Sequence, residues 1–219
     1  MNHYKISRNR IVKIPEAAPW ADDSVQSEDI ERVTQKYNLP EKYFLFVGTL
    51  EPRKNLIRLV QAFRLFCNET KENYKLLIVG KKSYSYEKIF KEVMNLQLTQ
   101  QVVFTGHIPE FDLKPIYIRA VALVFPSLLE GFGLTPLEAM VCNIPVICSK
   151  KGALGEVIDN ACFSIDPEDI QSIKNGMIQI ITNPKLREKM IKRGKTRAKK
   201  FSWEKSGRKL LKVLEETAA

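Results

Sequence analysis

Short apolar runs alternate with amphipathic stretches over most of the chain. The apolar runs predict strands at residues 43–47, 75–79, 102–105, 121–125 and 145–148, with a weaker one at 161–165. Apolar residues at helical spacing predict helices between them, at 55–69, 85–95, 110–119, 134–142 and 153–158. Such alternation indicates a doubly wound, Rossmann-like α/β domain, in which helices cover both faces of a parallel sheet. Ligands of such domains bind beyond the carboxyl ends of the strands.

The first 42 residues follow a different pattern and predict a linking segment, 1–42, ahead of the α/β domain. A short apolar stretch at 10–14 predicts a strand, and the prolines that follow it exclude a helix there. A helix is expected at about 28–37, with Ser27 as its N-cap and with its end before Pro40.

The chain after Asp166 has a helical pattern to its end. Pro184, Gly194 and the pair Ser202-Trp203 divide this stretch into about three helices. We expect the α/β domain to extend over residues 43–200, and the last helix, within 201–219, to be a separate element.

The length, composition and cysteines are typical of a globular cytoplasmic domain. A chain of 219 residues can bury one substantial core, and 44% hydrophobic and 27% charged residues are ordinary values. The apolar runs are far shorter than a membrane span, and the first residues contain no signal-peptide core. Because the four cysteines form no Cys-x-x-Cys pair, we expect reduced, buried thiols.

The net charge of +10 is concentrated between Lys185 and Lys212, where 13 Lys or Arg face only Glu188 and Glu204. Such a stretch can contact an anionic membrane leaflet or nucleic acid, although a solvated helical face is more common. No aromatic-rich recognition motif accompanies the charge, so we expect no nucleic-acid binding. Peripheral contact with the inner face of a membrane, through residues 185–212, remains open.

A glycine loop after the strand at 121–125 is the first candidate site. It runs Glu130-Gly131-Phe132-Gly133-Leu134-Thr135-Pro136-Leu137-Glu138 and leads into a helix. Glycines allow close approach to a ligand, and free N–H groups at a helix N-terminus attract an anion. The two carboxylates can accept hydrogen bonds from sugar or ribose hydroxyls. Glu138 also has capping-box spacing to Thr135, whereas Glu130 has no obvious structural partner.

A second loop, after the strand at 43–47, runs Gly48-Thr49-Leu50-Glu51-Pro52-Arg53-Lys54-Asn55. Its two adjacent cations precede a helix, and cations are unfavourable at the positive end of a helix dipole unless an anion is also present. A diphosphate would be such an anion, and Arg53 and Lys54 would stabilise its charge as a leaving group. The alternative is a pair of solvated surface cations.

The nine-residue string from Glu130 to Glu138 resembles the Glu-x7-Glu signature of retaining glycosyltransferases of family 4, which have the GT-B fold. The resemblance implies that Glu130 contacts the transferred sugar, that Glu138 holds the ribose hydroxyls, and that the amides of Gly131 to Leu134 bind the donor diphosphate. It also implies metal-independent transfer of a hexose, of mannose or glucose type, from a nucleotide diphosphate sugar such as GDP-mannose or UDP-glucose. No Asp-x-Asp metal motif follows a strand, and we expect no metal.

The loop at 48–55 resembles the corresponding loop of mannosyltransferase-like members of that family. Many relatives have an Arg-x4-Lys pair here, which would place the Arg at Thr49, so only Lys54 carries over directly. We expect Gly48 and Thr49 to border the donor, and we assign catalytic roles to Lys54 and Glu130.

The loop after the third strand, Phe104-Thr105-Gly106-His107-Ile108-Pro109, also resembles the family. There it borders the nucleotide base through its backbone, which makes His107 and Ile108 candidates for donor binding. A catalytic base at His107 is not favoured, because a lone His beside a turn is usually a surface residue.

The resemblance covers the chain from about residue 10 but only the C-terminal, donor-binding half of the family's enzyme. It implies an N-terminal Rossmann-like half, missing or on a separate chain, which supplies the acceptor site, and a final helix at 201–219 that packs back towards that half. The alternative is a module that binds a nucleotide sugar without turnover of its own.

Overall fold

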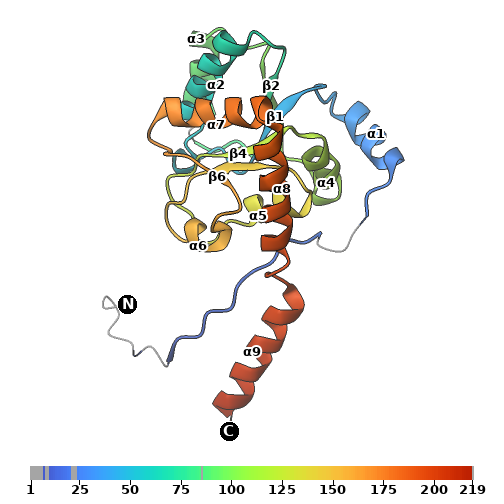
Figure 1. The fold of residues 1–219 in the computed structure, drawn as a ribbon, viewed down its shortest axis with the longest axis vertical. Helices are drawn as coiled ribbons and strands as arrows, with labels where there is room; N and C mark the ends of the chain where they lie inside the picture. The colour runs from blue at the N-terminus through green and yellow to red at the C-terminus, as the bar shows by residue number, and fades with distance from the viewer. Residues whose placement is uncertain (1–6, 8–9, 21–23, 85, 219) are drawn as a thin grey trace.

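A sheet of parallel strands forms the core of the protein (Figure 1). The computed structural model describes residue 7 and residues 10–20, 24–84 and 86–218. Within them the sheet has six strands in the order β3-β2-β1-β4-β5-β6, and every neighbouring pair is parallel. The strands are β1 (Tyr43–Val47), β2 (Lys75–Val79), β3 (Val102–Gly106), β4 (Ala122–Phe125), β5 (Val146–Cys148) and β6 (Phe163–Ser164). The predicted α/β class is therefore confirmed.

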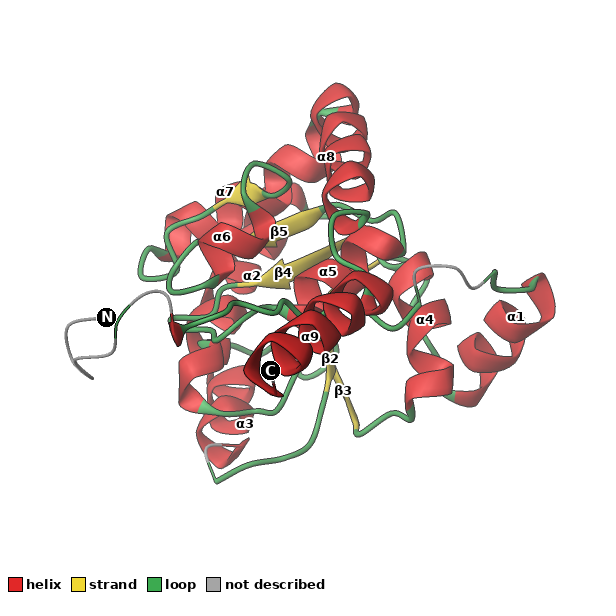
Figure 2. Ribbon diagram, turned by 90° about the horizontal axis from the view of Figure 1, so that it is seen from below, coloured by secondary structure: helices red, strands yellow, loops and turns green. Residues whose placement is uncertain are grey.

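Helices cover both faces of this sheet, which explains why its central strands are continuous apolar runs. On one face α2 packs against α3 and α7, and on the other α5 packs against α8 and α4 (Figures 1 and 2). These helices are α2 (Leu56–Thr70), α3 (Tyr86–Asn95), α4 (Glu110–Arg119), α5 (Leu134–Val141), α7 (Ile170–Thr182) and α8 (Pro184–Ala198). A short helix, α6 (Leu154–Ile158), connects β5 to β6.

The strand order creates a switch point between β1 and β4. From β1 the chain winds outward to β2 and β3, and then returns to place β4 on the other side of β1. The loops that follow β1 and β4 therefore leave the sheet in opposite directions. In open α/β sheets a crevice forms between such loops, and ligands bind there.

The N-terminal segment differs from the prediction in its strand. Residues 11–18 have no regular secondary structure, so the strand predicted at 10–14 is wrong. Ile11 and Val12 are exposed, Lys13 pairs with Glu156 of α6, and the segment passes below the sheet without pairing with any of its strands (Figure 1). The helix predicted at about 28–37 is α1 (Ser27–Lys36), and its N-cap is Gln26 rather than Ser27.

One buried carboxylate holds α1 against α4. The side chain of Asp112 is fully shielded from solvent, and its oxygens accept hydrogen bonds from Arg32 (2.9 Å), Lys36 (2.7 Å) and the hydroxyl of Tyr37 (2.7 Å). These bonds outweigh the effect of burial, which by itself would raise the pKa of Asp112, and the pKa is lowered.

The C-terminal part contains three helices, as predicted: α7, α8 and α9 (Trp203–Ala218). Gly194 does not divide them, because it lies inside α8 at its contact with α5, where an added Cβ would be 3.0 Å from Cγ of Met140. Helix α9 projects from the body (Figures 1 and 2), and Leu210, Leu211 and Leu214 on it are exposed.

The four cysteines are all free thiols; Cys142, Cys148 and Cys162 are buried and Cys67 is half-buried. No helix in the described ranges is both long enough and apolar enough to cross a membrane.

Candidate active site

The loops after β1 and β4 bring two cations onto one carboxylate. Nζ of Lys54 lies 2.7 Å from Oε1 of Glu130, and Nη1 of Arg53 lies 2.8 Å from its Oε2. The side chains of Lys54 and Glu130 are each 9% exposed, whereas that of Arg53 is 44% exposed. Three of the predicted site residues, 76 and 77 positions apart in sequence, thus meet at the switch point.

The sequence context of Glu130 indicated no structural partner, and this is wrong, because Lys54 and Arg53 both bond to it. Burial alone would raise its pKa, but hydrogen bonds from Lys54 first, and also from Arg53, outweigh it and hold the pKa below the usual value. Arg53 also pairs with Glu51, at 2.6 Å. The anion that we expected only from a ligand is thus already supplied by the protein.

Asn55, a residue that the sequence analysis did not single out, holds together the two loops that carry Lys54 and Glu130. Its backbone is left-handed (φ 61°), and its side-chain amide donates to the carbonyl oxygens of Pro126 (3.1 Å) and Pro167 (2.6 Å). The N–H of Leu128 in turn donates to the carbonyl of Arg53, at 2.8 Å. These bonds join the loops after β1 and β4. A sequence signal existed, since Asn tolerates left-handed backbone and lies here between two cations and a helix.

The glycine loop ends at the N-terminus of α5. Gly133 is the N-cap with φ 113°, and a Cβ there would overlap Cδ1 of Leu154, so only glycine fits. At Gly131 the space around an added Cβ is open. The first N–H groups of a helix have no partner within it, and the loop therefore offers backbone donors beside the pair of cations.

Glu138 does not form the expected capping box. The helix begins at Leu134, before Thr135, and no side chain caps it. Instead Oε2 of Glu138 accepts a hydrogen bond from the hydroxyl of Tyr117 in α4, at 2.6 Å. Burial raises the pKa of Glu138, and the bond from Tyr117 lowers it only in part.

The remaining predicted residues lie beyond the carboxyl ends of β1, β3 and β4. Gly48 and Thr49 follow β1, and Thr49 is exposed. His107 is exposed after β3, whereas the side chain of Ile108 is buried in the core, so only its backbone can face a ligand. Phe132, in the glycine loop, packs edge-on against Phe201, with ring centroids 5.8 Å apart.

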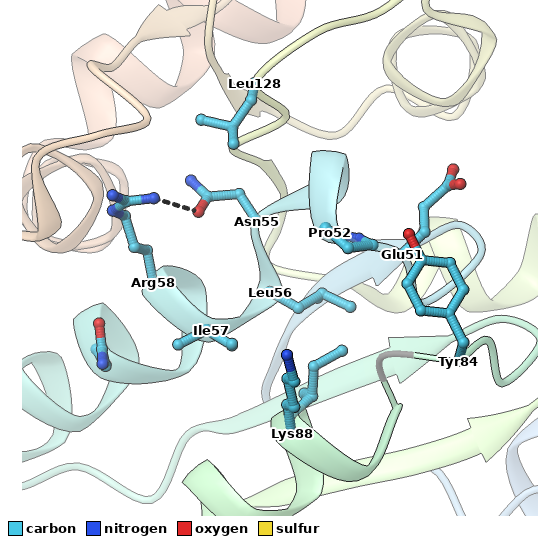
Figure 3. A pocket seen from close by; sticks show the side chains of 11 residues that line it. Glu51, Pro52, Asn55, Leu56, Ile57, Arg58, Tyr84, Lys88 and Leu128 are labelled. Carbon is cyan, nitrogen blue, oxygen red and sulfur yellow. Dashed lines mark hydrogen bonds between the residues drawn. The ribbon is translucent and has the colours of Figure 1, made fainter.

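A pocket of about 480 Å³ adjoins the loop after β1 (Figure 3). Glu51, Pro52 and Asn55 border it together with α2, Tyr84, Lys88 and Leu128, and Arg58 donates to Oδ1 of Asn55 at 3.1 Å. The residues predicted to bind the donor do not line this pocket, so it is distinct from the site at Lys54 and Glu130.

Metal ligands are not gathered at the site. Among the described residues, no group of three or more His, Cys, Asp or Glu side chains is placed to hold a metal ion. The arrangement offers two cations, backbone donors and two carboxylates, a set that can bind a diphosphate and hydroxyl groups.

The chain belongs to the family described as glycosyl transferases group 1, whose sequence pattern matches residues 27–197. It is similar to O-antigen chain mannosyltransferase B of Escherichia coli, with 38% identity over 173 residues, which cover 78% of this chain and 45% of that protein. It is also similar to the serotype-specific mannosyltransferase WbdA of E. coli, with 32% identity over 90% of this chain and 25% of that protein. The chain thus spans less than half the length of these relatives.

Among solved structures, one match is the C-terminal domain of a glycosyl transferase group 1 family protein, LpcC, from Francisella tularensis. The TM-score is 0.67 at 24% identity, and the match covers 80% of this chain and 93% of that one. The fold is therefore that of the C-terminal half of GT-B glycosyltransferases, as the resemblance implied.

Proposed function

We propose that this chain supplies the donor site for retaining transfer of a hexose, of mannose or glucose type, from a nucleotide diphosphate sugar to an acceptor hydroxyl. The observation that carries the proposal is the meeting of Lys54, Arg53 and Glu130 at the switch point, beside the N-terminus of α5. The names of the relatives, O-antigen and serotype-specific mannosyltransferases, favour mannose and a role in polysaccharide synthesis.

In this proposal the cations exchange partners when the donor binds. The diphosphate approaches the amides of Gly131 to Leu134 and takes Lys54 and Arg53 from Glu130. The two cations then stabilise the charge that develops on the leaving diphosphate, without a metal. Glu130, once released, contacts the sugar; we assign it no nucleophilic role. Glu138 holds the ribose hydroxyls, and Gly48, Thr49 and the backbone at His107 and Ile108 border the nucleotide.

We further propose that turnover requires an N-terminal Rossmann-like half, in the same protein or on a separate chain. Residues 43–200 would be the donor-binding unit, 1–42 the crossover, and 201–219 a helix that packs against the other half. Two observations support this division. Leucines on α9 are exposed, and the chain matches less than half the length of the mannosyltransferases to which it is similar. Without the second half, no acceptor is held near the donor, and the contribution of positioning, up to ~10⁵–10⁸ M in effective molarity, is lost.

Calorimetric titration of the chain with GDP-mannose, UDP-glucose and UDP-N-acetylglucosamine tests the donor site. We expect binding of at least one of the three, unchanged by EDTA, and failure of all three to bind would overturn the proposal. Transfer is then measured with and without an added N-terminal half. Several turnovers per second by the chain alone would contradict the need for that half, whereas binding without transfer in both cases would indicate a nucleotide-sugar-binding module.

A further inference from the structure

Glu138 has one carboxylate oxygen engaged and the other available. The hydroxyl of Tyr117 donates to Oε2 at 2.6 Å, and no described residue donates a hydrogen bond to Oε1. Glu138 is partly exposed, whereas Tyr117 is fully buried. A carboxylate that is fixed through one oxygen presents the other in a single orientation, and less side-chain entropy is lost when a ligand binds it.

The tyrosine is itself held on its far side. The ring of Trp20 packs on that of Tyr117, with centroids 5.7 Å apart, and Nζ of the buried Lys114 donates to the carbonyl of Trp20, at 3.1 Å. Burial raises the pKa of Tyr117 well above its usual value, so the phenol stays protonated and can only donate to the carboxylate. The donor to Glu138 is therefore a buried, protonated phenol whose ring packs against Trp20.

We infer that Tyr117 is a positioning residue for recognition of the ribose, because it orients the carboxylate of Glu138 so that Oε1 accepts the hydroxyl groups of the nucleotide. The inference rests on the proposed function, in which Glu138 holds the ribose. The alternative is that the bond merely satisfies a buried tyrosine hydroxyl. In that case removal of the hydroxyl would change stability but not the choice between ribose and deoxyribose.

The substitution Tyr117→Phe removes only the hydroxyl and keeps the ring that packs on Trp20. Tyr43→Phe is a matched control, because the hydroxyl of Tyr43 is also buried and donates to the carbonyl of Ile116 in α4, at 2.7 Å, rather than to Glu138. Both variants should lose similar stability. Melting curves for each variant show that the protein compared in the binding assay is folded.

The binding assay compares GDP with 2′,3′-dideoxy-GDP, and UDP with its dideoxy form, by calorimetry at pH 7. We expect the wild type to prefer the ribonucleotide and Glu138→Ala to lose that preference. In Tyr117→Phe, affinity for the ribonucleotide should fall roughly 5- to 30-fold, less than the full loss of a charge-assisted hydrogen bond because Glu138 is still present, with the dideoxy form unaffected. Tyr43→Phe should retain the wild-type preference, and Tyr117→Phe should add nothing to Glu138→Ala.

The pH profile gives a second readout. Glu138 accepts from hydroxyl groups best when ionised, and the bond from Tyr117 lowers its pKa against burial and the charge of Glu110 in α4. Without that bond the pKa of Glu138 rises. As the pH is lowered, Tyr117→Phe should therefore lose its affinity for the ribonucleotide at a higher pH than the wild type does.

The failures are distinguishable. If the wild type binds none of these nucleotides, or if Glu138→Ala keeps its ribose preference, the proposed donor site is overturned and the inference with it. If Glu138→Ala loses the preference while Tyr117→Phe retains it, or loses affinity for both forms equally, the inference alone is overturned.

Discussion

Nζ of Lys54 and Oε1 of Glu130 lie 2.7 Å apart, and little of either side chain is exposed. A partly buried pair of opposite charges is stable only while both partners remain, because removal of one leaves the other desolvated and unpaired. In this structure the carboxylate of Glu130 is paired with Lys54 and Arg53, the two cations that we propose bind the diphosphate. If the donor binds as proposed, its diphosphate must therefore compete with Glu130 for Lys54 and Arg53.

Glu130→Gln should raise affinity for the bare diphosphate. The neutral amide no longer neutralises Lys54 and Arg53, so their charge is available to GDP or UDP, and we expect affinity to rise roughly 3- to 10-fold. Glu51→Gln is the control, since among the described residues Glu51 pairs with the exposed Arg53 alone and should give a smaller gain. Calorimetry at 50 mM salt measures both, and unchanged or weaker GDP binding in Glu130→Gln would refute the competition.

Lys54→Met should weaken diphosphate binding and change the pH dependence of stability. GDP should lose far more affinity than guanosine, and stability at pH 7 should fall by about 1–3 kcal/mol, because Glu130 keeps its bond from Arg53 but loses the one from Lys54.

The sign of the pH effect follows from the lowered pKa of Glu130. That carboxylate stabilises the wild type above its unfolded pKa, about 4.3, and the contribution is lost as pH falls through the folded pKa. The difference between wild type and Lys54→Met should therefore be largest near pH 7 and shrink towards pH 3, as measured by urea unfolding. Lys88→Met, at an exposed lysine of the neighbouring pocket, should show neither effect.

Asp112→Asn should loosen α1 from α4. The neutral amide keeps the shape but loses the charge that Arg32 and Lys36 face, at a cost of about 1–3 kcal/mol. Since the pKa of Asp112 is lowered, its stabilisation is present above the usual carboxyl pKa and disappears as pH falls through the folded value. Urea unfolding at pH 7 and pH 3 measures this. Asp29→Asn, which removes only an exposed partner of Arg32, should cost under about 0.5 kcal/mol.

Gly133→Ala should disrupt the glycine loop, whereas Gly131→Ala should not. The first adds a Cβ at a positive φ and against Leu154, with an expected loss of about 1–3 kcal/mol and of nucleotide binding. The second adds a Cβ into open space, so its thermal midpoint should stay near that of the wild type. Equal midpoints for the two variants would show that the backbone at Gly133 is not constrained.

Residues 185–212 give a prediction for anionic surfaces. Lys189, Lys192 and Arg193 line a basic hollow of about 340 Å³ on α8, and each Lys or Arg near an anionic leaflet contributes about 1 kcal/mol. Sedimentation with phosphatidylglycerol vesicles should exceed that with phosphatidylcholine and be lost at high salt. Lys189→Glu with Lys192→Glu should abolish it, whereas Lys88→Glu with Lys91→Glu on α3 should not. If the protein shows no preference for anionic vesicles, membrane contact is refuted and residues 185–212 form a solvated helical face.

The strands and helices of the α/β domain could be predicted because their periodicity is local. The strand at 10–14 could not be excluded, since an apolar stretch forms a strand only where a sheet edge is within reach. Gly194 was predicted to break a helix, because glycine is a weak helix former. Its actual role is close packing of α8 against Met140 of α5, and a contact between two helices cannot be seen in the local sequence.

The same limit applies to the site. The spacing of Glu130 and Glu138 pointed to both carboxylates, and the two cations marked the facing loop. Their partners depend on pairings across the fold: Lys54 with Glu130, and Tyr117 with Glu138. Only the local capping alternative for Glu138 was visible in the sequence, and it is wrong.

The side chain of Asn55 bonds to Pro126 and to Pro167, so one amide joins the loop after β1 to the loop after β4 and to the segment ahead of α7. Local opening of any one segment must break at least one of these bonds, which favours opening of the three together as one cooperative unit. Their backbone amides should then exchange with solvent deuterium at a common slow rate. The loops after β1 and β4, which form the proposed diphosphate site, would in that case open and close together rather than one at a time.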